Sequence, residues 1–324
     1  MRASLVASAL AAAVCTAVAA PGAQWTIHDP GQGPVPLASS DTGAHQLSGL
    51  TWAEHARYYA VSDTLRTLYP LSIVLDPRHG TITHAGLAPG IALSGATDLE
   101  GVAYDATHAT VLVADERGPA VREYRLDGSL VRTLPVPTVY RSARHNLALE
   151  SLTIEPDEHG VWTANEETLA ADGPRSNATA GSVVRLQHFD RHHRPAGQWA
   201  YVTDPTSGDL SWTVAGSGVV DLVALPGGGL LALERAFGAG GLRSRLYEVD
   251  RHGASDTSAL SILARASYTP VRKALLWERV FPDINYEGAA LGPVLDDGSR
   301  SLVLISDDGH SLRQTLYALT LRHS

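Results

Sequence analysis

Several residue types are scarce in this sequence, and each shortage excludes a class of protein. Cys15 is the one cysteine among 324 residues, so we expect no disulfide, thiolate zinc site or cysteine nucleophile in the folded domain. Lys273 is the one lysine, and 34 acidic residues against 25 basic ones give a formal charge of −9. Without a basic tract the chain has no surface for a polyanion, so we expect no nucleic-acid partner.

Long hydrophobic runs are also scarce. The main one, residues 5–20, follows Met1 and Arg2 and includes the small residues Ala17-Val18-Ala19, which is typical of a secretory signal peptide. It is shorter than the roughly 20 apolar residues of a membrane-spanning helix, so we expect no membrane span. We therefore predict a signal peptide at residues 1–20, one domain at residues 21–324, and a location in the periplasm or outside the cell.

Helical periodicity is nearly absent beyond this segment, whereas one strand pattern recurs five times. Each repeat begins with a short apolar strand that carries an acidic or small polar residue near its start, at residues 47–52, 99–104, 149–154, 220–225 and 286–291. A turn and a second apolar strand follow, and the second strand ends in acid, as in residues 111–116 and 302–307. A more polar hairpin completes most repeats.

This organisation predicts an all-β fold, a β-propeller of five four-stranded blades. Six blades remain an alternative if residues 207–214 hide a degenerate one. The last repeat supplies only three strands, so a strand near Trp25 is expected to complete it and close the ring. In the fourth repeat we expect the outer strand at residues 259–263, and residues 271–280 are a candidate for one or two helical turns.

The acids of the repeats are expected to meet. Inner strands of a propeller run in the same direction along a central channel, and the start of one strand lies beside the end of its antiparallel neighbour. Both sets of acids should therefore share one mouth of the channel, together with Asp98, Glu116, Glu167 and Asp308. Crowded carboxylates repel one another unless they bind a cation or take up protons, and oxygen ligands without cysteine favour Ca²⁺.

Other interpretations of the same residues stay open. The acids could cap strands and pair with Arg117, Arg235 or Arg243. His145, like His45, lies shortly before an acidic strand and is a candidate general base. We interpret three aromatic residues within inner strands as wedges between blades; these are Trp52, Tyr104 and Trp162. The sequence has no Gly-x-Ser-x-Gly motif, so we expect no serine nucleophile of that type.

Several segments resemble the bacterial phytase-like family, which is described as having esterase-like activity of phytase. They include residues 97–104 (TDLEGVAY), 230–237 (LLALERAF) and 285–293 (NYEGAALGP), and the likeness spans essentially the whole mature chain. The resemblance implies a secreted propeller related to the alkaline phytases, which have six blades, bind Ca²⁺ and hydrolyse phosphomonoesters of inositol.

For the site, the resemblance implies a Ca²⁺ cluster that holds phosphate and activates a water, with arginine stabilising the developing charge. Arg117 and Arg235 are the implied phosphate partners, and together with His145 they are the candidate catalytic residues. The candidate Ca²⁺ ligands are Asp63, Glu100, Asp115, Glu150, Glu166, Asp221, Glu234, Glu287 and Asp307.

Three functions fit these expectations. The preferred one is a metal-dependent hydrolase of phosphoric or carboxylic esters, lactones included, that acts on a small molecule at the acidic mouth. The second is a binding propeller without enzymatic activity that uses the same face. The third is a secreted propeller in which Ca²⁺ is purely structural. We expect the protein to be a monomer.

Overall fold

A computed structural model describes residues 23–37, 43–156, 160–206, 216–238, 241–309 and 313–324. The predicted signal peptide at residues 1–20 lies outside these ranges. Within them, no helix is long and apolar enough to cross a membrane. Apart from the 3₁₀ helix η1 (Thr138–Ser142), the regular secondary structure of the described residues consists of strands.

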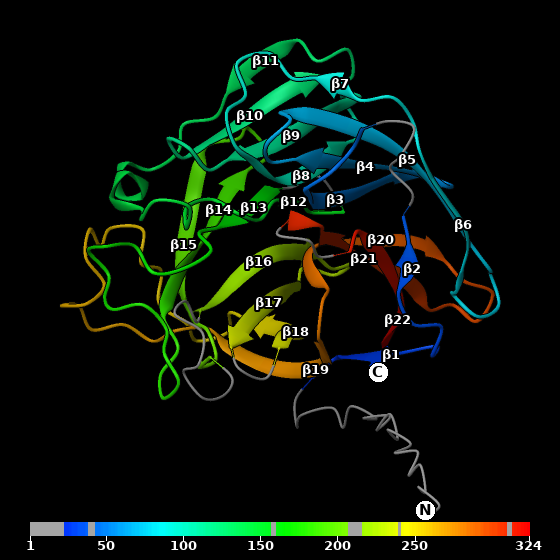
Figure 1. Ribbon diagram of the computed structural model, residues 1–324. Coiled ribbons are helices and arrows are strands. Elements are labelled where there is room, and N and C mark those ends of the chain that lie inside the picture. The colour runs from blue at the N-terminus through cyan, green and yellow to red at the C-terminus, as the bar shows by residue number, and fades with distance from the viewer. Residues whose placement is uncertain (1–22, 38–42, 157–159, 207–215, 239–240, 310–312) are drawn as a thin grey trace, which may run out of the picture.

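The strands form five sheets in a ring around one central axis (Figure 1), which confirms the predicted five-bladed β-propeller. Blade 1 contains β3 (Leu47–Glu54), β4 (Arg57–Ser62), β5 (Thr67–Leu75) and β6 (Ile82–Leu87), with β7 (Ile91–Ala92) beside β5. Blade 2 contains β8 (Leu99–Asp105), β9 (Thr110–Asp115), β10 (Ala120–Arg125) and β11 (Leu130–Thr133). Blade 3 contains β12 (Thr153–Ile154), β13 (Gly160–Ala164), β14 (Val183–Asp190) and β15 (Pro195–Val202).

The last two blades close the ring. Blade 4 contains β16 (Gly216–Ala224), β17 (Leu230–Gly238), β18 (Gly241–Asp250) and β19 (Arg272–Phe281). Blade 5 contains β20 (Asn285–Val294), β21 (Arg300–Asp307), β22 (Thr315–His323) and the N-terminal β1 (Trp25–His28), with β2 (Val35–Pro36) also on β22. The pairing of β1 with β22 confirms that the N-terminal strand completes the last blade. Residues 207–215, which include the segment considered for a sixth blade, lie outside the described residues.

The outer strand of blade 4 differs from the prediction. Residues 259–263 are not a strand, and residues 271–280, considered for helical turns, lie almost entirely in β19. The reason lies in the neighbouring blade, because the backbone N–H of Thr257 bonds to Gln198 and that of Leu263 bonds to Asp172, both in blade 3. The segment after β18 therefore packs on blade 3, and β19 takes the free edge of blade 4.

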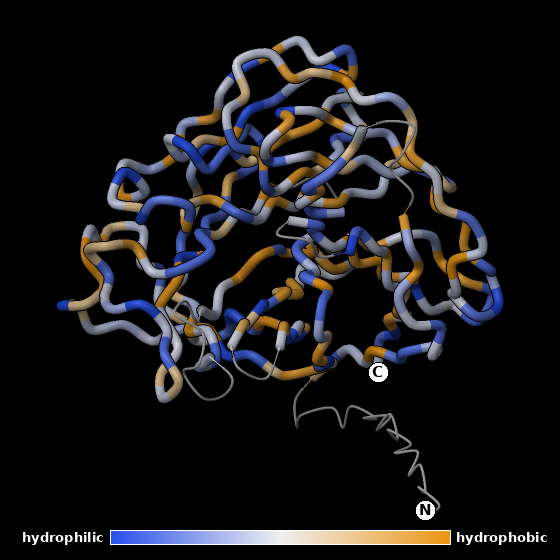
Figure 2. Tube along the Cα trace, viewed as in Figure 1, coloured by the Kyte–Doolittle hydropathy of each residue, from blue (hydrophilic) through white to orange (hydrophobic). Residues whose placement is uncertain are grey.

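The hydrophobic core is divided among the five interfaces between neighbouring blades. Between blades 4 and 5, Trp277 meets Tyr317 with ring centroids 5.7 Å apart. Between blades 3 and 4, Trp162 is 1% exposed and packs in a cluster with residues of both blades, so it is the wedge that the sequence predicted. Figure 2 shows hydrophobic residues along the strands and many hydrophilic ones in the outer turns.

Candidate functional site

Irregular strand pairing occurs in the inner strands where the predicted acids begin each repeat. In β8, Leu99 pairs with Asp115 and Val102 pairs with Val113, so two residues, Glu100 and Gly101, lie opposite one. Similar shifts in register interrupt β3, β16 and β20. A bulge bends the strand and re-aims its side chains, and bulges are frequent beside active sites. Each bulge thus changes which side chains of its inner strand face the channel.

Five glutamates and one arginine meet at one end of the channel. We call this group the acidic mouth; it consists of Glu100, Glu116, Glu150, Glu166, Glu287 and Arg235. Each glutamate is at most 7% exposed. The guanidinium of Arg235 forms ion pairs with Glu166 and Glu287. One positive charge therefore faces five carboxyl groups.

Three of these glutamates are spaced for a cation. One carboxylate oxygen each from Glu100, Glu116 and Glu150 lies within 4.8 Å of the other two. Because Ca²⁺–oxygen distances are about 2.3 to 2.6 Å, two oxygens about 4.8 Å apart can bind the same ion. This donor set fits an oxophilic divalent cation.

Burial and mutual repulsion disfavour the ionised form of the glutamates. Burial raises the pKa of Glu100 well above its usual range, and the carboxylates of Glu287 and Glu116 add to the effect. Burial likewise raises the pKa of Glu150 well above its usual range, and it raises the pKa of Glu116 and of Glu287 to about 8. Near neutral pH the mouth therefore holds protons that a bound cation would displace.

Two predicted ligands lie at the edge of the acidic mouth. Burial, together with the nearby carboxylate of Asp307, raises the pKa of Asp63 to about 6. Asp307 also raises the pKa of Glu287, and it accepts a hydrogen bond from the backbone N–H of Gly309 at 2.8 Å. Asp63 and Asp307 thus extend the negative field of the mouth outward.

The structure places three other predicted ligands outside the acidic mouth. Asp115 accepts a hydrogen bond from the backbone N–H of Thr97 at 2.9 Å and pairs with Arg122. Asp221 accepts bonds from the backbone N–H groups of Leu222 at 2.8 Å and Ala289 at 2.7 Å. Both acids are buried and join segments of the propeller. The expectation that all the acids converge is therefore too broad.

Glu234, the third of these residues, belongs to a separate polar cluster between blades 3 and 4. It is fully buried and accepts a hydrogen bond from the backbone N–H of Asp204 at 3.0 Å. It also meets the hydroxyl of Tyr201 and the ammonium of Lys273. Its carboxylate is thus matched by partners of its own.

A cavity that we call the rim pocket lies beside the acidic mouth. It has a volume of about 150 Å³, and its walls include Asp98, Glu116, Arg117, Arg144 and His145. The side chain of Arg117 is 67% exposed, with its Nε 3.9 Å from Asp98. Two of the three candidate catalytic residues, Arg117 and His145, therefore share this pocket with Glu116, whereas Arg235 lies within the mouth.

Sequence reasoning placed Glu116 at the mouth but left it out of the candidate ligands in favour of its neighbour Asp115. Every residue of β9 is buried, so alternation of apolar and polar residues could not show which of two adjacent acids faces the channel. The available signal was that Asp115 and Glu116 are adjacent in the sequence. Successive side chains point to opposite sides of a strand, so the two acids should not both face the channel.

Close backbone contacts join the inner strands of blades 5, 1, 2 and 3. A Cβ on Gly101 would lie 2.4 Å from the backbone nitrogen of Leu152, and one on Gly49 would lie 2.4 Å from the carbonyl oxygen of Glu100. A Cβ on Gly288 would lie 2.4 Å from the carbonyl oxygen of Ser48. We call Gly49, Gly101 and Gly288 the glycine neck. It lets the inner strands approach closely just beyond the acids.

Comparisons with known proteins give one family. No curated protein matches the sequence. Similar solved structures include a luciferin-regenerating enzyme (TM-score 0.43, 14% identity, 89% of this chain and 95% of that chain) and Kuenenia stuttgartiensis hydrazine synthase (0.40, 11%, 86% and 63%). These likenesses identify no function. Residues 42–310 match the family model described as "Phytase-like: Esterase-like activity of phytase", and because the match covers most of the chain, the protein belongs to the phytase-like family.

Proposed function

We propose that the protein is a metal-dependent hydrolase of phosphoric or carboxylic esters, lactones included, and that it acts at the acidic mouth. The observation that carries this proposal is the close approach of Glu100, Glu116 and Glu150, whose carboxylate oxygens lie within 4.8 Å of one another in buried positions. Membership of a family described by esterase-like activity supports the reaction class. The proposed location is the periplasm or the exterior of the cell.

The three glutamates would hold Ca²⁺, since their donors are all hard oxygens. When bound, such a cation polarises an ester or phosphoryl oxygen and lowers the pKa of a water. Arg235 fixes Glu166 and Glu287 through ion pairs, so these two carboxylates stay in place beside the three ligands. Burial raises the pKa of both, and the charge of Arg235 limits that rise.

The rim pocket is the proposed place of the substrate. Arg117 offers a largely exposed guanidinium for an anionic group of the substrate. His145 lines the same pocket and is exposed, so its imidazole can accept or deliver a proton at an ester oxygen. The pocket shares Glu116 with the acidic mouth, so an ester bound in it would lie next to the proposed cation ligands.

Adding Ca²⁺ to the chelated protein is expected to raise its thermal midpoint. At a concentration 100 times the dissociation constant the stabilisation is about 2.7 kcal/mol. The glutamates have raised pKa values, so without metal their contribution to stability is present below about pH 4.5 and is lost as the pH rises to about 8. The Ca²⁺ effect should therefore grow over this pH range. Differential scanning calorimetry at several pH values measures it.

Two variants test whether the cation binds where we propose. Glu150→Gln should abolish the rise in midpoint. Asp115→Asn should lower the midpoint without metal, because it weakens the pairing with Arg122, but it should keep the Ca²⁺-dependent rise. No rise in the unmodified protein, together with no metal in the purified sample, would contradict the hydrolase proposal and leave a binding propeller.

Replacing His145 by alanine is expected to lower kcat/KM by about 100-fold, the usual contribution of a general acid or base. p-Nitrophenyl phosphate, p-nitrophenyl acetate and a lactone serve as test substrates with the Ca²⁺-loaded protein. His192→Ala, an exposed turn residue, is the control and should leave the rate unchanged. Equal rates for His145→Ala and the control would remove His145 from the proposed mechanism.

A further inference from the structure

The channel has a second opening at the end opposite the acidic mouth. Along β8 and β20 a glutamate of the mouth comes first, a glycine of the neck follows, and apolar residues come next, as in Glu100, Gly101 and Val102. A cavity of about 270 Å³ lies beyond the neck, with walls from the inner strands of all five blades. We call this cavity the apolar funnel.

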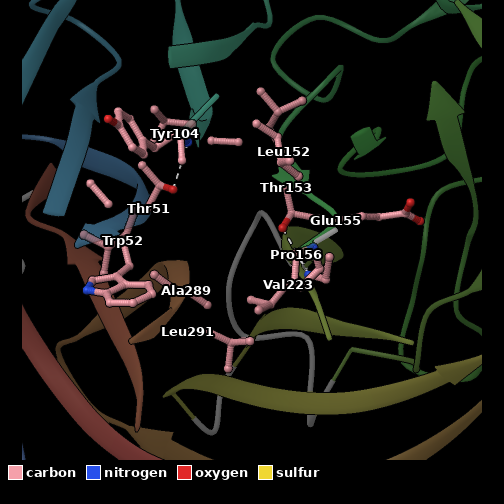
Figure 3. A pocket seen from close by; sticks show the side chains of 18 of the residues that line it. Thr51, Trp52, Tyr104, Leu152, Thr153, Glu155, Pro156, Val223, Ala289 and Leu291 are labelled. Carbon is pink, nitrogen blue, oxygen red and sulfur yellow. Dashed lines mark hydrogen bonds between the residues drawn. The ribbon is translucent and has the colours of Figure 1, made fainter. Parts of the chain in front are cut away.

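Apolar and aromatic side chains make up most of the funnel wall. Figure 3 shows Trp52 and Tyr104 on one side and Leu152 and Val223 on the other, with Leu291 below and between them. Trp52 and Tyr104 were expected to be wedges between blades, but both are only half-buried. Each packs against an interface on one side and borders the funnel on the other.

The side chains of Thr51, Thr153 and Trp52 in the wall already have partners. The hydroxyl of Thr51 accepts a bond from the backbone N–H of Tyr104, and that of Thr153 accepts one from Ala224, each at 3.0 Å. Nε1 of Trp52 donates to the carbonyl of His55 at 3.0 Å. Water in the funnel would find few side-chain partners, and poorly bound water is displaced easily by an apolar group.

The remaining polar groups of the wall belong to the backbone. Each inner strand forms the edge of its sheet, and an edge strand leaves alternate N–H and C=O groups without a partner in the sheet. Two of the N–H groups at this level are bonded by Thr51 and Thr153. A ligand with one hydrogen-bond donor can therefore use a carbonyl oxygen of such an edge.

We propose that the apolar funnel binds a small uncharged aromatic molecule, of one ring or two fused rings, that carries one hydrogen-bond donor. The size follows from the volume, since a cavity of about 150 Å³ accommodates benzene and the funnel measures about 270 Å³. The rings of Trp52 and Tyr104 provide faces and edges for aromatic contacts. This site is separate from the acidic mouth and does not depend on the proposed hydrolase function.

Charged ligands fit the funnel less well. Its two charged wall residues already interact with the protein, because Glu155 accepts a hydrogen bond from Nε1 of Trp162 at 2.8 Å and Arg300 donates to the carbonyl of Gly292 at 3.4 Å. Placing a further charge against the apolar part of the wall, away from Arg300, carries a desolvation cost without a partner to offset it. Indole is therefore a suitable probe, and benzoate is its charged counterpart.

The test is titration of the full-length protein with indole. Isothermal titration calorimetry and saturation-transfer NMR detect the binding. We expect saturable binding of indole, competition by 2-naphthol and at least tenfold weaker binding of benzoate. Leu291→Trp should weaken indole binding at least tenfold by filling part of the cavity, and Trp52→Ala should weaken it several-fold. Trp199→Ala, a half-buried tryptophan outside the funnel, is the matched control.

Chelation distinguishes this site from the acidic mouth. Indole binding should be the same with and without excess EDTA, because the funnel uses none of the mouth carboxylates. The thermal midpoint of each variant confirms that it folds. Absence of saturable binding, or binding that neither Leu291→Trp nor Trp52→Ala weakens, would overturn the proposal even if the protein proves to be a hydrolase.

Discussion

Replacing Gly101 by alanine is expected to lower the free energy of unfolding by about 3 kcal/mol, the upper part of the usual range for overpacking. The new Cβ would lie 2.4 Å from the backbone nitrogen of Leu152 and 2.5 Å from the carbonyl carbon of Ser151. Neither is the end of a flexible side chain, so relief requires blades 2 and 3 to move apart. Urea unfolding followed by circular dichroism measures the loss.

Gly86→Ala is the matched control for this substitution. Gly86 also lies in a strand, β6, but a Cβ there would meet only the ring nitrogen of His84, at 3.5 Å. It should change the free energy of unfolding by less than about 1 kcal/mol, since ordinary van der Waals contact costs little. Equal losses for the two variants would mean that the glycine neck is not a point of close contact.

Replacing Arg235 by methionine is expected to lower the free energy of unfolding by about 3 kcal/mol at pH 8, as is typical when one partner of a buried ion pair is removed. Burial opposes the charge of Arg235, but Glu166 and Glu287 raise its pKa, so it is the positive charge that these carboxylates require. Removing it leaves five carboxyl groups in one buried cluster.

The loss should be smaller at pH 5 than at pH 8. Without Arg235 the carboxyl groups can become neutral by binding protons, and their pKa values, already raised by burial, rise further. Stability that depends on protonated carboxyls is present at low pH and is lost as the pH rises. Denaturant titrations of the chelated variant at the two pH values measure the difference.

Arg322→Met provides the comparison for Arg235→Met. Arg322 pairs with Asp297, and the two side chains are 57% and 50% exposed. Removing the charge of Arg322 should therefore lower the free energy of unfolding by no more than about 1 kcal/mol at either pH. A loss for Arg235→Met that matches this control, or one that shrinks as the pH rises, would show that Arg235 does not balance the acidic mouth.

The repeat pattern predicted the blades because alternating apolar strands leave a strong signal. It also predicted the closing strand at Trp25, since the last repeat was one strand short. It could not predict β19, because the choice between residues 259–263 and residues 272–281 depends on hydrogen bonds to Gln198 and Asp172 in another blade. Such contacts between distant segments have no local pattern in the sequence.

The candidate site was predicted as a region rather than as a set of ligands. Recurrence of an acid near the start of most inner strands predicted Glu100, Glu150 and Glu287 at one mouth, and the structure brings these three residues together. The exclusion of Asp115 and Asp221 depends on irregular strand pairing and on backbone N–H groups that approach from other segments. Sequence spacing does not record a one-residue bulge, so it could not separate these acids from the glutamates.

The pairing of β1 with β22 places the two ends of the described chain side by side. Trp25 lies opposite His323, and the backbone N–H of Ser324 donates to the carbonyl of Gln24 at 2.8 Å. A short linker could therefore join the ends, and new termini could be opened in an exposed turn such as that at Gly227 and Gly228. In such a circular permutant the last blade would be held to the ring by a covalent bond, and β1 could no longer detach from the end of the chain.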